Sequence, residues 1–243
     1  PLNLDDEVYA SIDFYKPELI IVMGYGLLIP TKILKYPKFG CINIHVSLLP
    51  RWRGASPIEH TILNGDKESG VSIIKLIEKL DAGPILSQKK IRISENINKD
   101  ELTKQLSEIG TELLINFLPN YFQNSIQTID QDEEKATYAK KINSKTRKIN
   151  FNLPCKDVYN QIRAFSSSPG AWFDYKNERI KIISAQLINK KSIPSKIISK
   201  QFELGCLDGC IKPQYLQREG KRILAIEDFL RGFSFDIGDS LNE

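Results

Sequence analysis

Asn43 and His45 are the two side chains in this sequence best placed to do chemistry together. They lie two residues apart in Cys41-Ile-Asn-Ile-His-Val46, whose alternation predicts a β-strand. Alternate side chains of a strand share a face, so Asn43 and His45 point the same way. An amide donor beside an imidazole can stabilise a developing oxyanion and carry a proton. A hydrogen-bonded polar edge at a strand end explains the same pair equally well.

Asp81 and His60 are the other candidate polar residues. Asp81 precedes Ala-Gly-Pro84, where aspartate is an ordinary turn residue, and this pattern alone favours a structural role. His60, the only other histidine, follows Pro57 on a short predicted helix and is expected at the surface. The four cysteines lack the spacing of a disulfide framework or a zinc site, so no metal centre is expected.

The elements that must position these residues predict an α/β fold. Apolar, β-branched runs predict strands at residues 19–23, 41–46, 70–77 and 85–93. Helical spacing and capping residues predict helices at residues 30–34, 57–63 and 98–117. Strands that alternate with helices favour a mostly parallel sheet, and such sheets bind ligands at the carboxyl ends of their strands. Asn43 and His45 lie at such an end.

The second half of the sequence has a different pattern. Residues 120–148 lose the helical periodicity and gain polar residues, which predicts a linker. A helix is then predicted at residues 156–165. Short strand-like segments follow, and many short strands with turns between them indicate a small β-barrel or sandwich. These segments are residues 171–175, 179–187, 205–211 and 222–226.

Composition excludes several classes of protein. The chain has 243 residues, of which 41% are hydrophobic and 26% charged, so disordered, collagen-like and coiled-coil classes are excluded and one or two domains are expected. The longest apolar run, residues 19–23, is far shorter than the ~20 residues of a membrane-spanning helix. We therefore expect a soluble cytoplasmic protein that does not use a membrane.

The positive charge is concentrated in one segment. Residues 1–130 hold 14 Lys and Arg against 16 Asp and Glu, whereas residues 131–243 hold 20 against 14. Within the second part, residues 135–200 carry 15 basic and 3 acidic residues, a net charge of +12. This basic block is a candidate surface for a polyanion, and a solvated lysine-rich face explains it as well.

The segment Ser47-Leu-Leu-Pro-Arg-Trp-Arg-Gly54, directly after the strand, is the most specific motif. It resembles the signature loop of the folate-dependent formyltransferases. Further segments match that family in the same order, and several ordered motifs are much stronger evidence than one. They are residues 23–30, 70–73, 80–83, 136–141, 162–165, 169–172 and 227–232.

The resemblance implies a mostly parallel, Rossmann-like formyltransferase sheet followed by a small OB-like β-barrel. It implies a catalytic domain at residues 1–120, a basic linker at 121–148 and a tRNA-binding domain at 149–243. The sequence begins with Pro1 within a predicted helix, and the family's first strand and Gly-rich turn are expected before it.

The resemblance also implies the chemistry. The family transfers a formyl group from 10-formyltetrahydrofolate to an amine without a metal, through a tetrahedral oxyanion. Its catalytic Asn, His and Asp fall on Asn43, His45 and Asp81. Leu48 and Leu49 are equally well explained as core residues. The implied folate contacts are Tyr25, Gly26, Leu27, Leu28, Ile29, Ser47, Leu48, Leu49 and Pro50.

Arg51-Trp52-Arg53 and the basic block resemble those family members that formylate methionyl initiator tRNA for translation initiation. We expect a monomer. Sugar-nucleotide formylation, formyltetrahydrofolate hydrolysis and an inactive nucleic-acid-binding fragment are the alternatives. The implied tRNA contacts are Lys140, Lys141, Lys145, Arg147 and Lys148.

Overall fold

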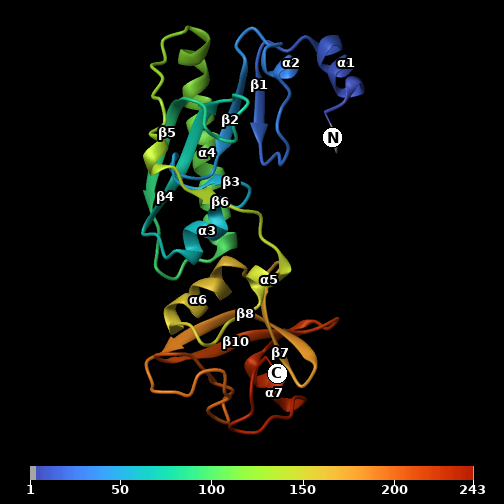
Figure 1. Cartoon of the computed structure of the whole chain (residues 1–243), viewed down its shortest axis with the longest axis vertical. Helices are drawn as coiled ribbons and strands as arrows, with labels where there is room; N and C mark the ends of the chain where they lie inside the picture. Colours follow the sequence, from blue (N-terminus) through green and yellow to red (C-terminus); the bar gives the residue numbers. More distant parts are fainter. Residues whose placement is uncertain (1–3, 243) are drawn as a thin grey trace. The chain divides into compact units, whose positions relative to one another are not determined.

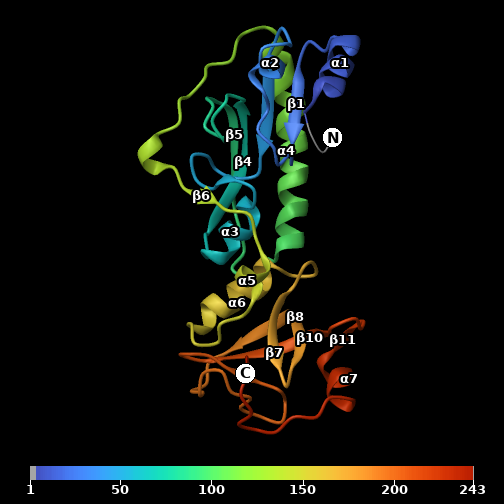
Figure 2. The same cartoon turned by 45° about the vertical axis from the view of Figure 1, so that its right-hand side comes forward.

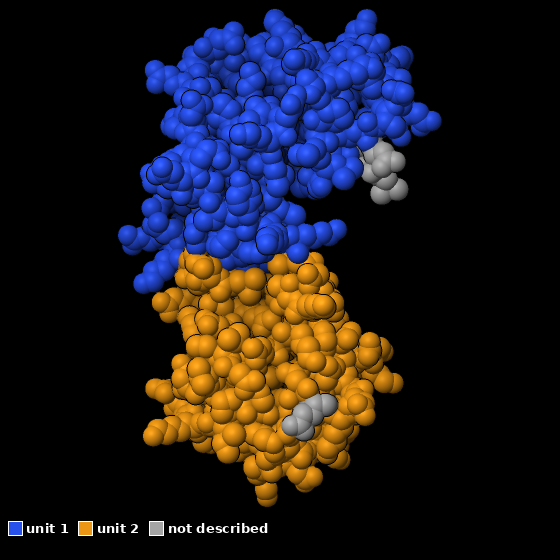
Figure 3. Space-filling view, in the orientation of Figure 1, with its two compact units in different colours: residues 1–61, 67–93, 103–141 blue, residues 62–66, 94–102, 142–243 orange. Residues whose placement is uncertain are grey.

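The structure is a computed structural model that describes residues 4–242, and its contacts divide the chain into two compact units (Figure 3). Unit 1 comprises residues 1–61, 67–93 and 103–141, and unit 2 comprises residues 62–66, 94–102 and 142–243. Most of the segment expected as a linker therefore belongs to unit 1. Ile129 exchanges two backbone hydrogen bonds with Ile85, at 2.8 and 2.9 Å, and these attach the segment to the sheet.

Unit 1 is built on a mixed four-stranded sheet with the order β1-β2-β4-β5 (Figure 1). Its strands are β1 (Ile20–Met23), β2 (Cys41–His45), β4 (Glu68–Lys75) and β5 (Ile85–Arg92). The α/β class is confirmed, and β1 and β2 are parallel as expected. The β2–β4 and β4–β5 pairs are antiparallel. The connection between β4 and β5 is too short for the crossover that parallel neighbours need. β4 begins past the carboxyl end of β2 and runs back alongside it.

The helices in this part of the described chain are α1 (Asp6–Tyr15), α2 (Thr31–Leu34), α3 (Pro57–Leu63) and α4 (Lys99–Phe122). The long helix α4 runs beside the sheet (Figure 2), where Phe117 packs with Ile42 and Ile73 in a buried cluster. The capping box expected at its start is confirmed. Asn98 Oδ1 accepts from the Glu101 amide at 3.0 Å, and Glu101 Oε2 accepts from the Asn98 amide at 3.1 Å.

Unit 2 is built on an antiparallel sheet with the order β11-β10-β8-β7, and β9 pairs with β10. This sheet fits the barrel-like domain that the sequence predicts. The strands are β7 (Ala171–Tyr175), β8 (Glu178–Ile188), β9 (Leu204–Gly205), β10 (Cys210–Arg218) and β11 (Ile223–Ala225). The helices are α5 (Ser144–Arg147), α6 (Cys155–Ala164) and α7 (Ile226–Arg231).

Two strand predictions in unit 2 were wrong, one in its middle and one at its end. The expected strand at residues 205–211 is interrupted, because the Cys206 amide donates to the Gly209 carbonyl at 2.8 Å and closes a turn through Asp208. Asp208 also caps α6 by accepting from the Cys155 amide at 2.7 Å. The strand expected at 222–226 ends at Ala225, where α7 begins. Among residues 4–242, no helix is both long and apolar enough to cross a bilayer.

Candidate active site

Asn43, His45 and Asp81 converge within unit 1. Asn43 and His45 project from β2, and Asp81 lies in the turn between β4 and β5. Asn43 Nδ2 donates to Asp81 Oδ1 at 3.2 Å, and His45 Nδ1 lies 3.7 Å from Asp81 Oδ2. His45 and Asp81 are buried, with 6% and 8% of their surfaces exposed. An amide, an imidazole and a carboxylate therefore share one site.

The Asp81 carboxylate is held from two directions. Its Oδ2 accepts from the Gly54 amide at 2.8 Å, in addition to the bond that Oδ1 accepts from Asn43. Asp81 itself has a left-handed backbone, with φ at 47°. Two residues later, a Cβ added to Gly83 would lie 1.7 Å from the Lys75 carbonyl oxygen, so only glycine fits there. The turn therefore directs the carboxylate toward β2.

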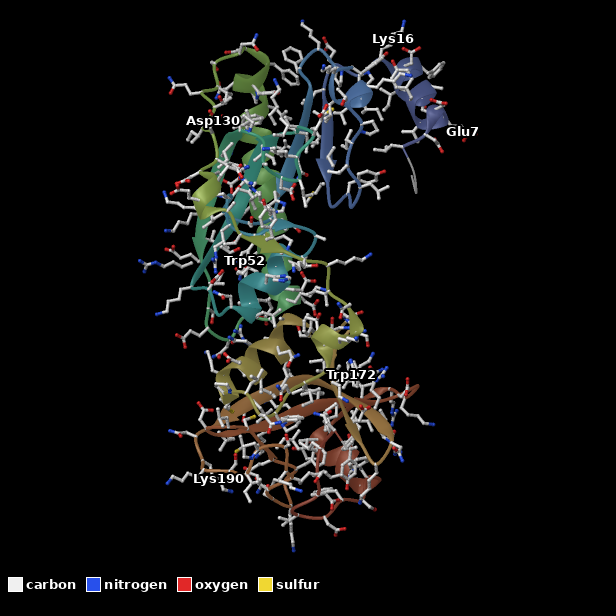
Figure 4. The ribbon with its side chains drawn as sticks, in the orientation of Figure 1. Glu7, Lys16, Trp52, Asp130, Trp172 and Lys190 are labelled. Carbon is white, nitrogen blue, oxygen red and sulfur yellow. The ribbon has the colours of Figure 1, made fainter. Side chains whose placement is uncertain are left out.

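A backbone carbonyl orients His45. Its Nε2 lies 2.8 Å from the Trp52 carbonyl oxygen, and Trp52 is marked in Figure 4. Because a carbonyl only accepts, Nε2 carries the proton in the neutral ring. Nδ1, which faces Asp81, then carries a lone pair and can accept a proton.

The loop after β2 is fixed by buried hydroxyl groups. Ser47 Oγ donates to the Arg51 carbonyl, and Ser72 Oγ donates to the Ser47 carbonyl, both at 2.6 Å. Leu49 is buried and packs with Ile74 in a small core cluster, as its core interpretation predicts. Leu48 and Pro50 are half-buried. Ser47 and Leu49 thus shape the loop, while Leu48 and Pro50 retain exposed surface.

The loop at residues 25–29 follows β1, and its side chains are largely exposed. Leu27 and Leu28 have 49% and 64% of their surfaces exposed. Tyr25 is half-buried, and its buried Oη has no hydrogen-bond partner among the described residues. Because β1 and β2 are parallel in register, this loop and the loop after His45 leave the same edge of the sheet.

Two site residues, Gln131 and Glu133, were missed by the sequence analysis, and both contact Arg53 of the signature loop. Arg53 is almost fully buried, and its Nη1 and Nη2 donate to the Glu133 carboxylate at 3.1 and 3.0 Å. This hydrogen bond holds the pKa of Glu133 below its ordinary value. Arg53 Nε donates to Gln131 Oε1 at 3.0 Å. Gln131 Nε2 then donates to the Asp81 carbonyl at 2.8 Å, which ties this network to the turn.

The network also holds the signature loop in place. β3 (Arg53–Gly54) pairs with β6 (Tyr138–Ala139), within the segment expected as a linker. A Cβ added to Gly54, whose φ is 112°, would lie 2.8 Å from the Ala139 carbonyl oxygen. No local pattern marked Gln131 or Glu133, because their partners lie more than 45 residues away in the sequence.

The five expected tRNA contacts lie on both sides of the unit boundary. Arg147 Nη1 donates to the Pro169 carbonyl at 3.3 Å, and Lys148 Nζ forms an ion pair with Asp174 at 2.8 Å. The other three are exposed: Lys140, Lys141 and Lys145. Within residues 4–242, no group of three His, Cys, Asp or Glu residues could hold a metal ion.

An amide, imidazole and carboxylate at the edge of an α/β sheet, with an antiparallel domain after it, define the class of the formyl transferases. The family model "Formyl transferase" matches residues 2–118, and "Formyl transferase, C-terminal domain" matches residues 141–234. Methionyl-tRNA formyltransferase of Wolbachia pipientis subsp. Culex pipiens is 43% identical over 95% of this chain and 74% of its own length. That of Brucella melitensis biotype 2 is 39% identical over 94% and 75%. The chain belongs to the methionyl-tRNA formyltransferase family.

Solved structures share the fold. HypX from Aquifex aeolicus in complex with tetrahydrofolic acid superposes with a TM-score of 0.72 at 19% identity, over 94% of this chain and 43% of that chain. Methionyl-tRNA formyltransferase from Clostridium thermocellum superposes with a TM-score of 0.62 at 22% identity, over 79% and 80%. The likeness includes a protein with a bound folate, in keeping with a folate-dependent family.

Proposed function

We propose that this chain transfers the formyl group of 10-formyltetrahydrofolate to the α-amino group of methionyl initiator tRNA. The observation that carries the proposal is the convergence of Asn43, His45 and Asp81, in a chain 43% identical to a methionyl-tRNA formyltransferase. This reaction begins translation with a formylated methionine.

The reaction needs one oxyanion to be stabilised and one proton to be moved. The amine nitrogen bonds to the formyl carbon, the oxygen becomes negative, and the bond from that carbon to folate N10 then breaks. Asn43 has two amide hydrogens and gives one to Asp81, so the other is available to the oxyanion. His45 supplies a second donor once its ring turns its Nε2–H from the Trp52 carbonyl toward the oxyanion.

Asp81 is the group we assign to the proton. The amine must lose a proton as it attacks, and N10 must gain one as it leaves. A buried carboxylate beside an imidazole can take the first and return it to the second, directly or through a water molecule. Because Asp81 contacts both Asn43 and His45, the same carboxylate also orients the two oxyanion donors.

The loops at residues 25–29 and 47–50 fit the pteridine end of a folate. Leu27 and Leu28 offer exposed apolar surface beside the edge where His45 lies. The unpartnered Oη of Tyr25 can donate to a ring nitrogen or carbonyl oxygen of such a ligand. A mostly apolar pocket wall with a few polar groups is typical of small-molecule sites.

The acceptor substrate is tested by comparing two acceptors in separate reactions. The purified protein is given 10-formyltetrahydrofolate with either charged initiator methionyl-tRNA or a UDP-amino sugar, and the formylated products are quantified. We expect formylation of the tRNA with a kcat/KM far above that for the sugar. Faster formylation of the sugar would replace the tRNA by a sugar nucleotide, and release of formate at the same rate without any amine would indicate a hydrolase.

A further inference from the structure

Gln131 joins the signature loop to the turn that carries Asp81. It is half-buried and lies between the two regions that the family models match. Its Nε2 donates to the Asp81 carbonyl at 2.8 Å and to the Gly83 carbonyl at 2.7 Å. Its Oε1 accepts from Arg53 Nε at 3.0 Å. Both amide hydrogens and the amide oxygen of this side chain are therefore engaged at the candidate site.

The orientation of the Gln131 amide follows from its partners. A guanidinium N–H only donates and a backbone carbonyl only accepts, so the amide oxygen faces Arg53 and the amide nitrogen faces the turn. Arg53 is almost fully buried, and its other two nitrogens donate to the Glu133 carboxylate at 3.1 and 3.0 Å. The donor that fixes Oε1 is therefore itself held in place.

The same loop and Gln131 hold Asp81 at two points. Gln131 holds its backbone carbonyl, and the Gly54 amide, one residue after Arg53, donates to its Oδ2 at 2.8 Å. These contacts close a ring that joins the signature loop, Gln131 and the turn. Asp81 has a left-handed backbone, with φ at 47°, which is uncommon outside glycine and persists where the surroundings hold it. The two bonds that Gln131 donates to the turn supply such a hold.

We propose that Gln131 is a positioning residue for formyl transfer, which holds the turn so that the Asp81 carboxylate stays beside Asn43 and His45. The inference rests on the proposed function and extends its site into the segment between the two matched regions. Gln131 acts through Asp81 and takes no part in bond making. Because a displacement of about 1 Å can cost about 10²-fold in rate, its loss should lower kcat and leave substrate binding nearly unchanged.

Gln131→Glu tests the two donated bonds alone, because its carboxylate keeps an acceptor for Arg53. We expect kcat for formylation to fall about 10- to 100-fold, with KM for 10-formyltetrahydrofolate and for methionyl-tRNA within about twofold of wild type. The matched control is Gln217→Glu, which makes the same change where the amide donates to the Lys221 carbonyl in unit 2 at 2.8 Å. It should keep wild-type kcat.

Thermal unfolding shows whether Gln131→Glu folds, and Gln131→Met, which is uncharged and of similar size, replaces it if it does not. Unchanged kcat in the folded variant would overturn the proposal. A raised KM with unchanged kcat would also overturn it, in favour of a role in substrate binding.

A double-mutant cycle separates the positioning of Asp81 from general support of the domain. If Gln131 acts through Asp81, Gln131→Glu should lower the rate no further in protein that already carries Asp81→Ala. Single-turnover formylation with the enzyme in excess measures these slow rates. Losses that multiply would show that Gln131 acts independently of Asp81 and would remove its positioning role.

Hydrogen exchange of the Gly54 amide gives a readout that does not depend on activity. This amide donates to the Asp81 carboxylate, so its exchange, followed by NMR in protein labelled at its glycine amides, reports whether the carboxylate is in place. We expect exchange about tenfold faster in Gln131→Glu than in the wild type.

The two hypotheses can therefore fail separately. If the wild type does not formylate methionyl-tRNA while Gly54 exchanges faster in Gln131→Glu, the proposed function fails and the placement of Asp81 by Gln131 stands. If the wild type formylates methionyl-tRNA and the variant matches it in both kcat and exchange, only the assignment of Gln131 fails.

Discussion

At the scale of single residues, the candidate site is held by groups that each make more than one directed interaction. Asp81 accepts from both Asn43 and the Gly54 amide, and His45 lies between Asp81 and the Trp52 carbonyl. A donor that is already held in place stabilises an oxyanion more than one that must reorganise, and Asn43, bonded to Asp81, is such a donor. The contributions of single side chains can therefore be measured.

Removing Asn43 should remove an oxyanion donor and leave the fold intact. We expect Asn43→Ala to lower kcat by about 10²- to 10³-fold with a much smaller change in KM. Steady-state formylation kinetics check this. Asn64→Ala, which removes an exposed amide bonded to Asp66, is the control and should keep wild-type kcat. Near wild-type kcat in Asn43→Ala would remove Asn43 from the mechanism.

Cys41 should make stability depend on pH in the alkaline range. It is almost fully buried, and burial raises the pKa of its thiol to about 11. The native state then holds this proton more tightly than the unfolded state, so the stabilising effect is complete below about pH 8.5 and is lost as pH rises toward 11.

Urea unfolding of the wild type and of Cys41→Ala over this range measures the effect. The free-energy difference between them should shrink by up to about 2 to 3 kcal/mol from pH 8.5 to 11. A difference that does not vary with pH would show that Cys41 titrates normally in the folded protein.

At the scale of elements, the site depends on how β2, β4 and β5 meet. The antiparallel β4–β5 pair returns the chain so that its connecting turn presents Asp81 to Asn43, 38 residues earlier in the sequence. β6 joins the signature loop from the other side through its pairing with β3. Each element is short, and the site forms only where they are paired.

Helix α4 packs against this sheet, and its capping box should contribute measurably to stability. Asn98→Ala removes the acceptor for the Glu101 amide and should lower the free energy of unfolding by about 1 kcal/mol. Asn98→Asp keeps an acceptor and should cost only a few tenths of that amount. Chemical denaturation of the two variants compares them, and equal destabilisation would show that the cap is not the cause.

At the scale of the whole molecule, charge is divided unevenly. The basic block at residues 135–200 has a net charge of +12, but several of its cations are already paired, including Lys148 with Asp174. Lys140, Lys141 and Lys145 are exposed, and within residues 4–242 they make no ion pair. These three lysines are therefore available to phosphates.

Neutralising these three lysines as glutamines should weaken tRNA binding and lower the salt slope by about two to three, because each phosphate that is no longer neutralised removes about 0.7 to 0.9. Binding of the folate should not change, since its expected contacts lie at residues 25–29 and 47–50. The control neutralises the exposed Lys16, Lys89 and Lys104. Equal salt slopes for the two triple variants would show that the segment is only a solvated face.

The sequence alone determined those features of the protein that depend on residues close together in the chain. Alternation placed Asn43 and His45 on one face, Asn98 and Glu101 marked the start of α4, and the ordered motifs indicated the family. These features are readable because strand alternation and helix capping act over one to four residues.

Only the tertiary structure decided which distant groups meet. The pattern around Asp81 favoured an ordinary turn, and Gln131 and Glu133 lay in a segment that looked like a linker. The direction of β4 and the pairing of β3 with β6 were equally invisible. Strand direction and register, which bring such groups together, are set by packing between segments that lie tens of residues apart, and no local pattern records that packing.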